Sequence, residues 1–273
     1  MSSTNFSVFS FQKILVGIAL SLLIVLSVLG AIFGDLKVLT ISWLSFFSMT
    51  GAIPIGIRSA HQKKSLPIVN GYGMASGAMV VSAAIFLAPI AIRAHPAMGL
   101  LGVVIGISIG FTVHTITHRS FSSRWKIDSV LVELMLHTLF AGFVIGFIYA
   151  SMPGLSLLLG IAIISHKAPA GYAAARYLNA KEENPWLLLL PACGIGLTAL
   201  PVSMIDLPGI ALLNASIFGL ATGIFFHVAF NFLRSSMSSE IEFYTSHTGR
   251  NWWAVLNMFV GGGIVYLLWV VSR

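Results

Sequence analysis

The sequence predicts an all-α integral membrane helical bundle with nine membrane spans. Hydrophobic residues make up 57% of the 273 residues and charged residues only 8%, whereas roughly a quarter of the residues in soluble domains are charged. Apolar runs recur along the chain, and a bilayer core about 30 Å thick needs roughly 20 apolar residues per helix. The connections between runs are short, so we expect one bundle without a soluble domain.

Each expected span is an apolar run, and the basic residues cluster between runs. The first run begins after Lys13 and is longer than the roughly 7–15 apolar residues of a signal peptide. It is followed by no convincing small-residue cleavage site, so we expect a retained helix. In chain order the expected spans cover residues 13–33, 38–58, 71–93, 97–117, 128–150, 154–178, 185–205, 208–233 and 252–271.

Basic residues between the spans predict the orientation of the bundle. If the spans alternate, one side holds most of them: Arg58, Lys63, Lys64, Arg119, Arg124, Lys126, Arg176, Lys181, Arg234 and Arg250. The loops of the other side carry only Lys37 and Arg93. Because cytoplasmic loops are rich in Lys and Arg, we expect the N-terminus in the cytoplasm and the C-terminus outside, in a plasma (inner) membrane.

Composition also argues against several partners. The net charge of +7 comes without a basic face interleaved with aromatic residues, so we expect a lipid bilayer and no nucleic acid as partner. The single cysteine, Cys193, rules out an intrachain disulfide and disfavours a thiolate metal cluster. Three glycines at 261–263 allow close helix contact, within the chain or in a homodimer.

Polar residues inside the spans mark the candidate site, because a charge at mid-membrane costs at least about 2.5–3.5 kcal/mol and normally faces a cavity or a partner. Glu133 and His137 lie four residues apart, on one face of their helix. His166 and Lys167 lie side by side in the next span. An ammonium at that depth needs a partner, and we expect Glu133 to provide it.

Three other histidines are weaker candidates. His227 lies four residues before Asn231, and we interpret it first as a helix-helix hydrogen-bonding residue and second as part of a path. His114 and His118 have the spacing that can bind one metal ion. They equally suit interfacial polar residues beside a basic loop.

Two motifs resemble a known family of transporters. The stretch "LHTLFAGFVIG" is followed about thirty residues later by "SHKAPAGYAAA", and the pair resembles the H-N-x-P-E-G motifs on the fourth and fifth helices of the ZIP (Zrt/Irt-like) divalent metal transporters. The resemblance covers roughly residues 40–271. It implies a ZIP-like domain of eight helices over residues 37–273, preceded by one extra transmembrane helix within residues 1–36.

The resemblance implies a metal site, but the positions where the family has glutamates hold no carboxylate in this sequence. His137 stands at the position of the family's histidine on the fourth helix, and His166 stands at the first ligand of the fifth. Ala141, Ala170 and Leu200 occupy the positions of the three glutamates. Two dications need bridging carboxylates, so we expect a single site, in which His137, His166 and a relocated Glu133 bind one transition metal.

Other matched positions shape the expected path. Thr138 stands where the family has asparagine, and Lys167 stands where the family has an acidic or amide ligand. An ammonium there replaces the charge of a second ion and weakens binding of the first. The glycine and proline framework is kept: Gly142, Pro169, Gly171 and Pro201.

Three functions remain open from the sequence. The leading hypothesis is a divergent permease that moves a divalent transition metal, zinc foremost, into the cytoplasm, with Pro169 and Gly171 shaping its path. The alternative is a ZIP-fold protein that has lost metal transport and moves another solute, or acts as a regulatory or structural membrane protein. A membrane metalloenzyme is the weakest, because no nucleophile or general-base motif accompanies the histidines. We therefore expect no enzyme and no tightly bound cofactor.

Overall fold

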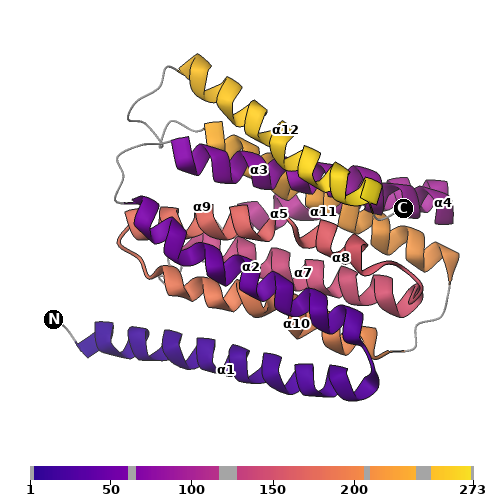
Figure 1. The fold of residues 1–273 in the computed structure, drawn as a ribbon, viewed down its shortest axis with the longest axis horizontal. Helices are drawn as coiled ribbons and strands as arrows, with labels where there is room; N and C mark the ends of the chain where they lie inside the picture. Colours follow the sequence, from indigo (N-terminus) through magenta and orange to yellow (C-terminus); the bar gives the residue numbers. More distant parts are fainter. Residues whose placement is uncertain (1–2, 61–65, 117–127, 206–209, 238–246, 272–273) are drawn as a thin grey trace.

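The computed structural model describes residues 3–60, 66–116, 128–205, 210–237 and 247–271. This part of the chain is an all-α bundle whose long helices run side by side along the longest axis (Figure 1). Eight of the described helices are long and apolar enough to cross a membrane. The expectation of an all-α membrane bundle is thus confirmed.

Helix bounds lie within about five residues of the expected spans, except that α1 begins at Ser3, ten residues before its expected start, and that one span is interrupted. The interrupted span is the exception that separates two groups of elements. The elements before the exception are α1 (Ser3–Phe33), α2 (Leu36–Ala60), α3 (Leu66–Ser82), the π-helical turn η1 (Ala83–Leu87), α4 (Ala88–Ala94), α5 (Pro96–Ile116) and α7 (Ser129–Ser151). Those after it are the 3₁₀ turn η3 (Pro185–Leu188), α10 (Leu189–Ser203), α11 (Ala211–Met237) and α12 (His247–Val271).

The exception is the sixth expected span, residues 154–178, which is not one continuous helix. It consists of α8 (Leu157–Ile164) and α9 (Lys167–Ala180), separated by a turn at Ser165 and His166. Pro169 explains the break, because it has no N–H to donate to the carbonyl of Ser165, four residues earlier, and its ring crowds that carbonyl. α8 and α9 follow one another along the bundle and together make one further pass (Figure 1).

The bundle is built from pairs of neighbouring helices. α7 packs on α10, α5 on α11, α3 on α12, and α2 on α9. α1 lies at one edge beside α10 (Figure 1). The start of α1 and the end of α12 lie at opposite ends of the bundle (Figure 1).

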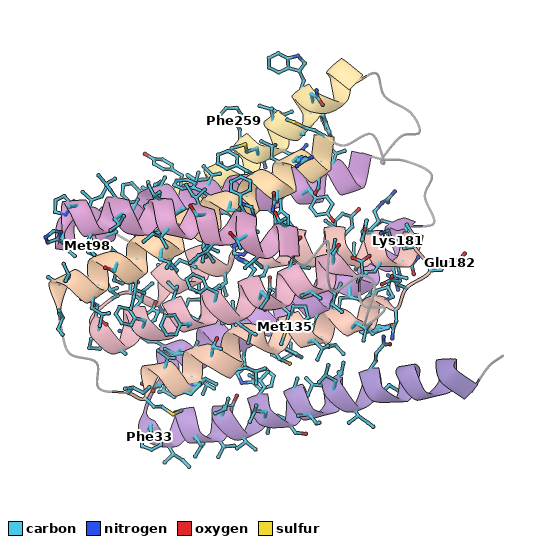
Figure 2. The ribbon with its side chains drawn as sticks, turned by 180° about the vertical axis from the view of Figure 1, so that it is seen from behind. Phe33, Met98, Met135, Lys181, Glu182 and Phe259 are labelled. Atoms are coloured by element: carbon cyan, nitrogen blue, oxygen red, sulfur yellow. The ribbon has the colours of Figure 1, made fainter. Side chains whose placement is uncertain are left out.

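Aromatic side chains on the outer helices point away from the bundle. Phe33 of α1 and Phe259 of α12 are 67% and 74% exposed, and both project outward (Figure 2). In a bilayer such side chains meet lipid rather than water, so their exposure stabilises the membrane-embedded state.

The described basic residues divide between the two ends. Lys181 lies at one end of the bundle, opposite the end where α1 finishes at Phe33 (Figure 2). Arg58 and Arg234 lie in the last turns of α2 and α11. At the other end Lys37 closes the turn between α7 and α8, because its Nζ donates to the carbonyl oxygens of Pro153 at 2.7 Å and Leu155 at 3.0 Å.

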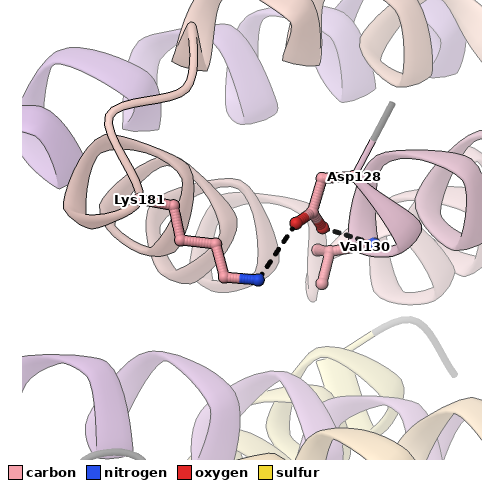
Figure 3. A network of polar contacts seen from close by, with 3 residues as sticks. All are labelled: Asp128, Val130 and Lys181. Carbon is pink, nitrogen blue, oxygen red and sulfur yellow. Dashed lines mark hydrogen bonds and ion pairs between the residues drawn. The ribbon is translucent and has the colours of Figure 1, made fainter. Parts of the chain in front are cut away.

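Asp128 joins α7 to α9 at the end that holds Lys181 (Figure 3). Its Oδ1 accepts a hydrogen bond from the backbone N–H of Val130 at 2.8 Å and so caps α7. Its Oδ2 lies 3.3 Å from Nζ of Lys181, the residue that follows α9. Hydrogen bonds to Tyr177 and to Asp128 raise the pKa of Lys181, so the lysine of this contact stays charged at neutral pH.

Glycines bring helix backbones into direct contact. A Cβ on Gly261 of α12 would collide with the carbonyl oxygen of Met74 in α3, and a Cβ on Gly77 would collide with that of Met258. Gly263 has nothing within 4 Å of its Cβ position. Of the three consecutive glycines, Gly261 and Gly262 therefore contact α3 within the same chain. Such close backbone contact stabilises helix pairs in lipid, where no hydrophobic driving force brings helices together.

Gly261→Ala is expected to lower stability while Gly263→Ala is not. The methyl group at 261 must push α3 and α12 apart, and such overpacking costs about 1–3 kcal/mol. At 263 the methyl group enters open space, where alanine is the better helix former by about 1 kcal/mol. Thermal unfolding of the two purified variants in one detergent measures the difference. Equal midpoints would contradict the packing of α3 on α12.

Asp128→Ala is expected to destabilise the protein by about 1 kcal/mol, the cost of losing a helix cap. Asp128→Asn is the matched control, because an amide oxygen still caps α7 while the negative charge disappears. Its cost is expected to stay below about 1 kcal/mol, since the side chain of Lys181 is 51% exposed and exposed ion pairs contribute little. Unfolding midpoints of both variants and of the parent protein test whether Asp128→Ala lowers stability more than Asp128→Asn does.

Candidate polar site at the broken helix

The break between α8 and α9 places two polar residues inside the bundle. His166 precedes the first residue of α9, which is Lys167. Only 1% of His166 and 2% of Lys167 is exposed. α9 packs against both α2 and α3, and His166 also meets His137 of α7 and Phe225 of α11. The polar side chains are therefore enclosed by protein and do not face lipid.

His137 of α7 meets His166 across the helix interface. Their Nε2 atoms lie 3.3 Å apart, and the ring centroids are separated by 5.4 Å. His137 is 5% exposed. The structure thus brings together the two histidines that the motif pairing singled out, although 29 positions separate them in the chain.

The 3.3 Å separation suits two states of the pair. In neutral rings one Nε2–H donates to the other Nε2, and the accepting ring then carries its proton on Nδ1. In a metal-bound state both Nε2 atoms are unprotonated ligands. A tetrahedral zinc ion holds nitrogen ligands at about 2.0–2.1 Å, which places two of them about 3.3 Å apart. Little movement would separate the two states.

Phe225 of α11 borders the histidine pair. Its ring centroid lies 5.4 Å from that of His137 and 5.9 Å from that of His166, in edge-on geometry both times. The side chain is fully buried. Analysis of the sequence did not single out Phe225, because one aromatic residue in an apolar span carries no polar signal.

Lys167 lacks the partner that the sequence suggested. Its Nζ is buried and has no hydrogen-bond partner among the described residues. Glu133, expected to pair with this ammonium, forms no such bond to it. Lys167 directly follows His166 at the start of α9 and is buried with it.

Glu133 also does not complete a metal site with the two histidines. Within the described ranges no group of three or more His, Cys, Asp and Glu side chains is placed to share one ion. Four residues along α7 correspond to about 6 Å of rise, so Glu133 lies one turn away from His137, nearer the end that holds Lys181. The expected three-ligand arrangement is therefore replaced by a two-histidine pair.

Thr138 and Gly171 contact neighbouring helices and not the histidine pair. The Thr138 hydroxyl donates to the carbonyl of Met135 at 3.0 Å and fills the space beside Gly194 of α10. A Cβ on Gly171 would lie 2.9 Å from Met49 of α2. Both positions thus serve helix packing in the structure.

His227 lies apart from the pair although its helix carries Phe225. Two residues correspond to about 200° around a helix, so the two side chains leave α11 in nearly opposite directions. The His227 ring lies 4.5 Å from that of Phe111 in α5, and its Nε2 is 2.9 Å from Nδ2 of Asn231. The side chain of His114 and all of His118 lie outside the described residues.

Comparisons with known proteins do not add to this geometry. The chain matches no family model, and no curated protein matches it significantly in sequence. The functional argument therefore rests on the arrangement of His137, His166 and Lys167.

The two histidines are expected to be energetically coupled. Either His137→Leu or His166→Leu leaves one buried ring nitrogen without its partner, at about 1–3 kcal/mol. The double variant removes both polar groups. Its loss in free energy of unfolding is expected to be smaller than the sum of the two single losses by about 0.5–1.5 kcal/mol. A double-mutant cycle on unfolding midpoints measures the coupling. Strict additivity would mean that the rings do not interact.

Proposed function

We propose that the protein is a permease that moves a divalent transition metal, zinc foremost, across the membrane through a single low-affinity site at His137 and His166. The observation that carries the proposal is the 3.3 Å separation of their Nε2 atoms, which is the spacing of two imidazole ligands on one tetrahedral ion. The burial of both side chains and the position of His166 at the break between α8 and α9 support it, because interrupted helices form the ion sites of many transporters.

A metal ion held by only two protein ligands suits a transport site better than a site that retains its ion. A tetrahedral ion held by two imidazoles keeps two positions for water or a passing ligand, and an ion must leave a transport site as readily as it enters. Structural zinc sites, in contrast, use four protein ligands. The proposal therefore includes weak binding.

The charge distribution indicates which end of the bundle faces the cytoplasm. The described basic residues Arg58, Lys181 and Arg234 share one end of the bundle, and the positive-inside rule places such an end in the cytoplasm. Uptake toward this end is the direction that we propose. The ZIP-like motif pairing and an eight-helix domain preceded by α1 belong to the same proposal.

A second candidate function is transport of another solute by a bundle that no longer carries metal. The observation that favours it is Lys167, whose buried ammonium repels a dication at the adjacent histidines. Metal uptake by the parent protein decides between the two candidates.

Zinc uptake is expected to depend on both histidines of the pair. In reconstituted vesicles, His137→Ala and His166→Ala are each expected to reduce initial uptake of radioactive zinc at least tenfold, because one imidazole cannot hold the ion. His227→Ala is the matched control, since this histidine is also buried (4% exposed) but contacts α5. Full uptake by either pair variant, or equal loss in the control, would reject the proposed site.

Lys167→Met is expected to lower the zinc concentration that gives half-maximal uptake by about tenfold. Methionine keeps the length of the side chain and removes the positive charge that opposes the metal ion. The same vesicle assay across a range of zinc concentrations measures the change. An unchanged or increased concentration would show that Lys167 does not act on the bound metal.

A further inference from the structure

Phe225 packs against both histidines of the pair. Its ring centroid lies 5.4 Å from that of His137 and 5.9 Å from that of His166, and the two imidazole centroids are themselves 5.4 Å apart. These separations are those of packed rings, so the three rings form a nearly equilateral triangle. The two Nε2 atoms, 3.3 Å apart, lie between the imidazole centroids. The phenyl ring therefore borders the gap between the two nitrogens.

Phe225 lies on an apolar face of α11. Phe218, Ala221 and Ala229 lie one or two turns away on the same face, and all three are fully buried, as Phe225 is. Thr222 also lies about one turn before Phe225, but its hydroxyl donates to the carbonyl oxygen of Phe218 at 2.8 Å. This face of α11 thus presents hydrocarbon to the histidine pair.

Direct backbone contact with α5 holds α11 in place. A Cβ on Gly223 would collide with the carbonyl oxygen of Val103 in α5, and a Cβ on Gly219 would collide with that of Gly99. Two residues correspond to about 200° around a helix, so Gly223 and Phe225 leave α11 on nearly opposite sides. Because the backbone of α11 has no room to move toward α5, the ring of Phe225 cannot retreat from the pair with its helix.

We propose that Phe225 is a positioning residue that limits an ion at the histidine pair to four ligands and thereby selects zinc over manganese. This inference rests on the proposed function. With hydrocarbon on one flank, an ion bound by both Nε2 atoms takes water or further donors only from the other flank. Zinc is satisfied by a tetrahedron of four ligands, whereas manganese prefers an octahedron of six.

A phenylalanine that only fills space would act differently. Removing any buried ring leaves a cavity and destabilises the protein, so the test needs a readout other than stability. Phe218→Ala is the matched control, because Phe218 is also fully buried on α11 but packs against Phe147, with ring centroids 5.8 Å apart. Phe225→Leu is a milder second variant, which decides the question if Phe225→Ala does not fold.

The absorption spectrum of bound Co²⁺ in the purified full-length protein is the first test. Tetrahedral Co²⁺ absorbs visible light far more strongly than octahedral Co²⁺, and equilibrium dialysis gives the amount bound. Absorbance per bound cobalt is expected to fall about tenfold in Phe225→Ala, because water completes an octahedral shell, and to fall less in Phe225→Leu. Phe218→Ala is expected to keep the parent value. An octahedral spectrum of the parent protein, or an unchanged spectrum in the Phe225 variants, would overturn the inference.

Ion selectivity in reconstituted vesicles is the second test. The ratio of initial zinc uptake to initial manganese uptake is expected to fall about tenfold in Phe225→Ala, because the enlarged space admits six ligands around manganese. Phe218→Ala is expected to keep the ratio of the parent protein. The same ratio in Phe225→Ala and in the parent protein would count against the role of the ring.

A histidine variant separates this inference from the proposed function. If the parent protein binds no cobalt and takes up no zinc, both fail. If the parent protein binds cobalt and His137→Ala does not, the proposed site stands. An unchanged spectrum and an unchanged zinc-to-manganese ratio in Phe225→Ala then reject the inference alone.

Discussion

The missing N–H of Pro169 is the constraint on which the candidate site depends. A continuous helix through residues 157–180 would satisfy its backbone internally and would present no helix end inside the bundle. Pro169 interrupts that pattern about one turn earlier in the chain, at Ser165 and His166. The interruption leaves the C-terminal end of α8 and the N-terminal end of α9 inside the bundle, each with the partial charge of a helix end. In a bilayer such an interruption is tolerated only where surrounding protein or a cavity satisfies it, and α2 and α3 pack against α9.

Close helix packing holds this interrupted span in place. Glycines on α5 and α11, such as Gly106 and Gly223, meet backbone to backbone, and Gly261 does the same between α12 and α3. Close approach of this kind is a principal source of association between helices in lipid, where burial of apolar surface contributes little. The packed bundle brings His137 against His166 without a covalent link.

The chemistry of the site follows from which charges are present. Two imidazoles meet at the break, alanine and leucine stand at the three positions where the expected resemblance places acids, and Lys167 adjoins His166. Among described side chains, no third ligand joins the histidines. In the proposed function, two nitrogen donors beside a lysine hold a dication weakly.

Sequence alone determined the all-α membrane architecture and the approximate bounds of eight apolar helices, and it identified His137, His166 and Lys167 as polar residues inside the spans. These features depend on local hydropathy and on the high cost of polar groups in a bilayer, which are properties of short segments. Only the tertiary structure decided that Glu133 stays apart from the pair and that Phe225 borders it. These depend on the rotation and depth of one helix relative to another, which side-chain packing decides.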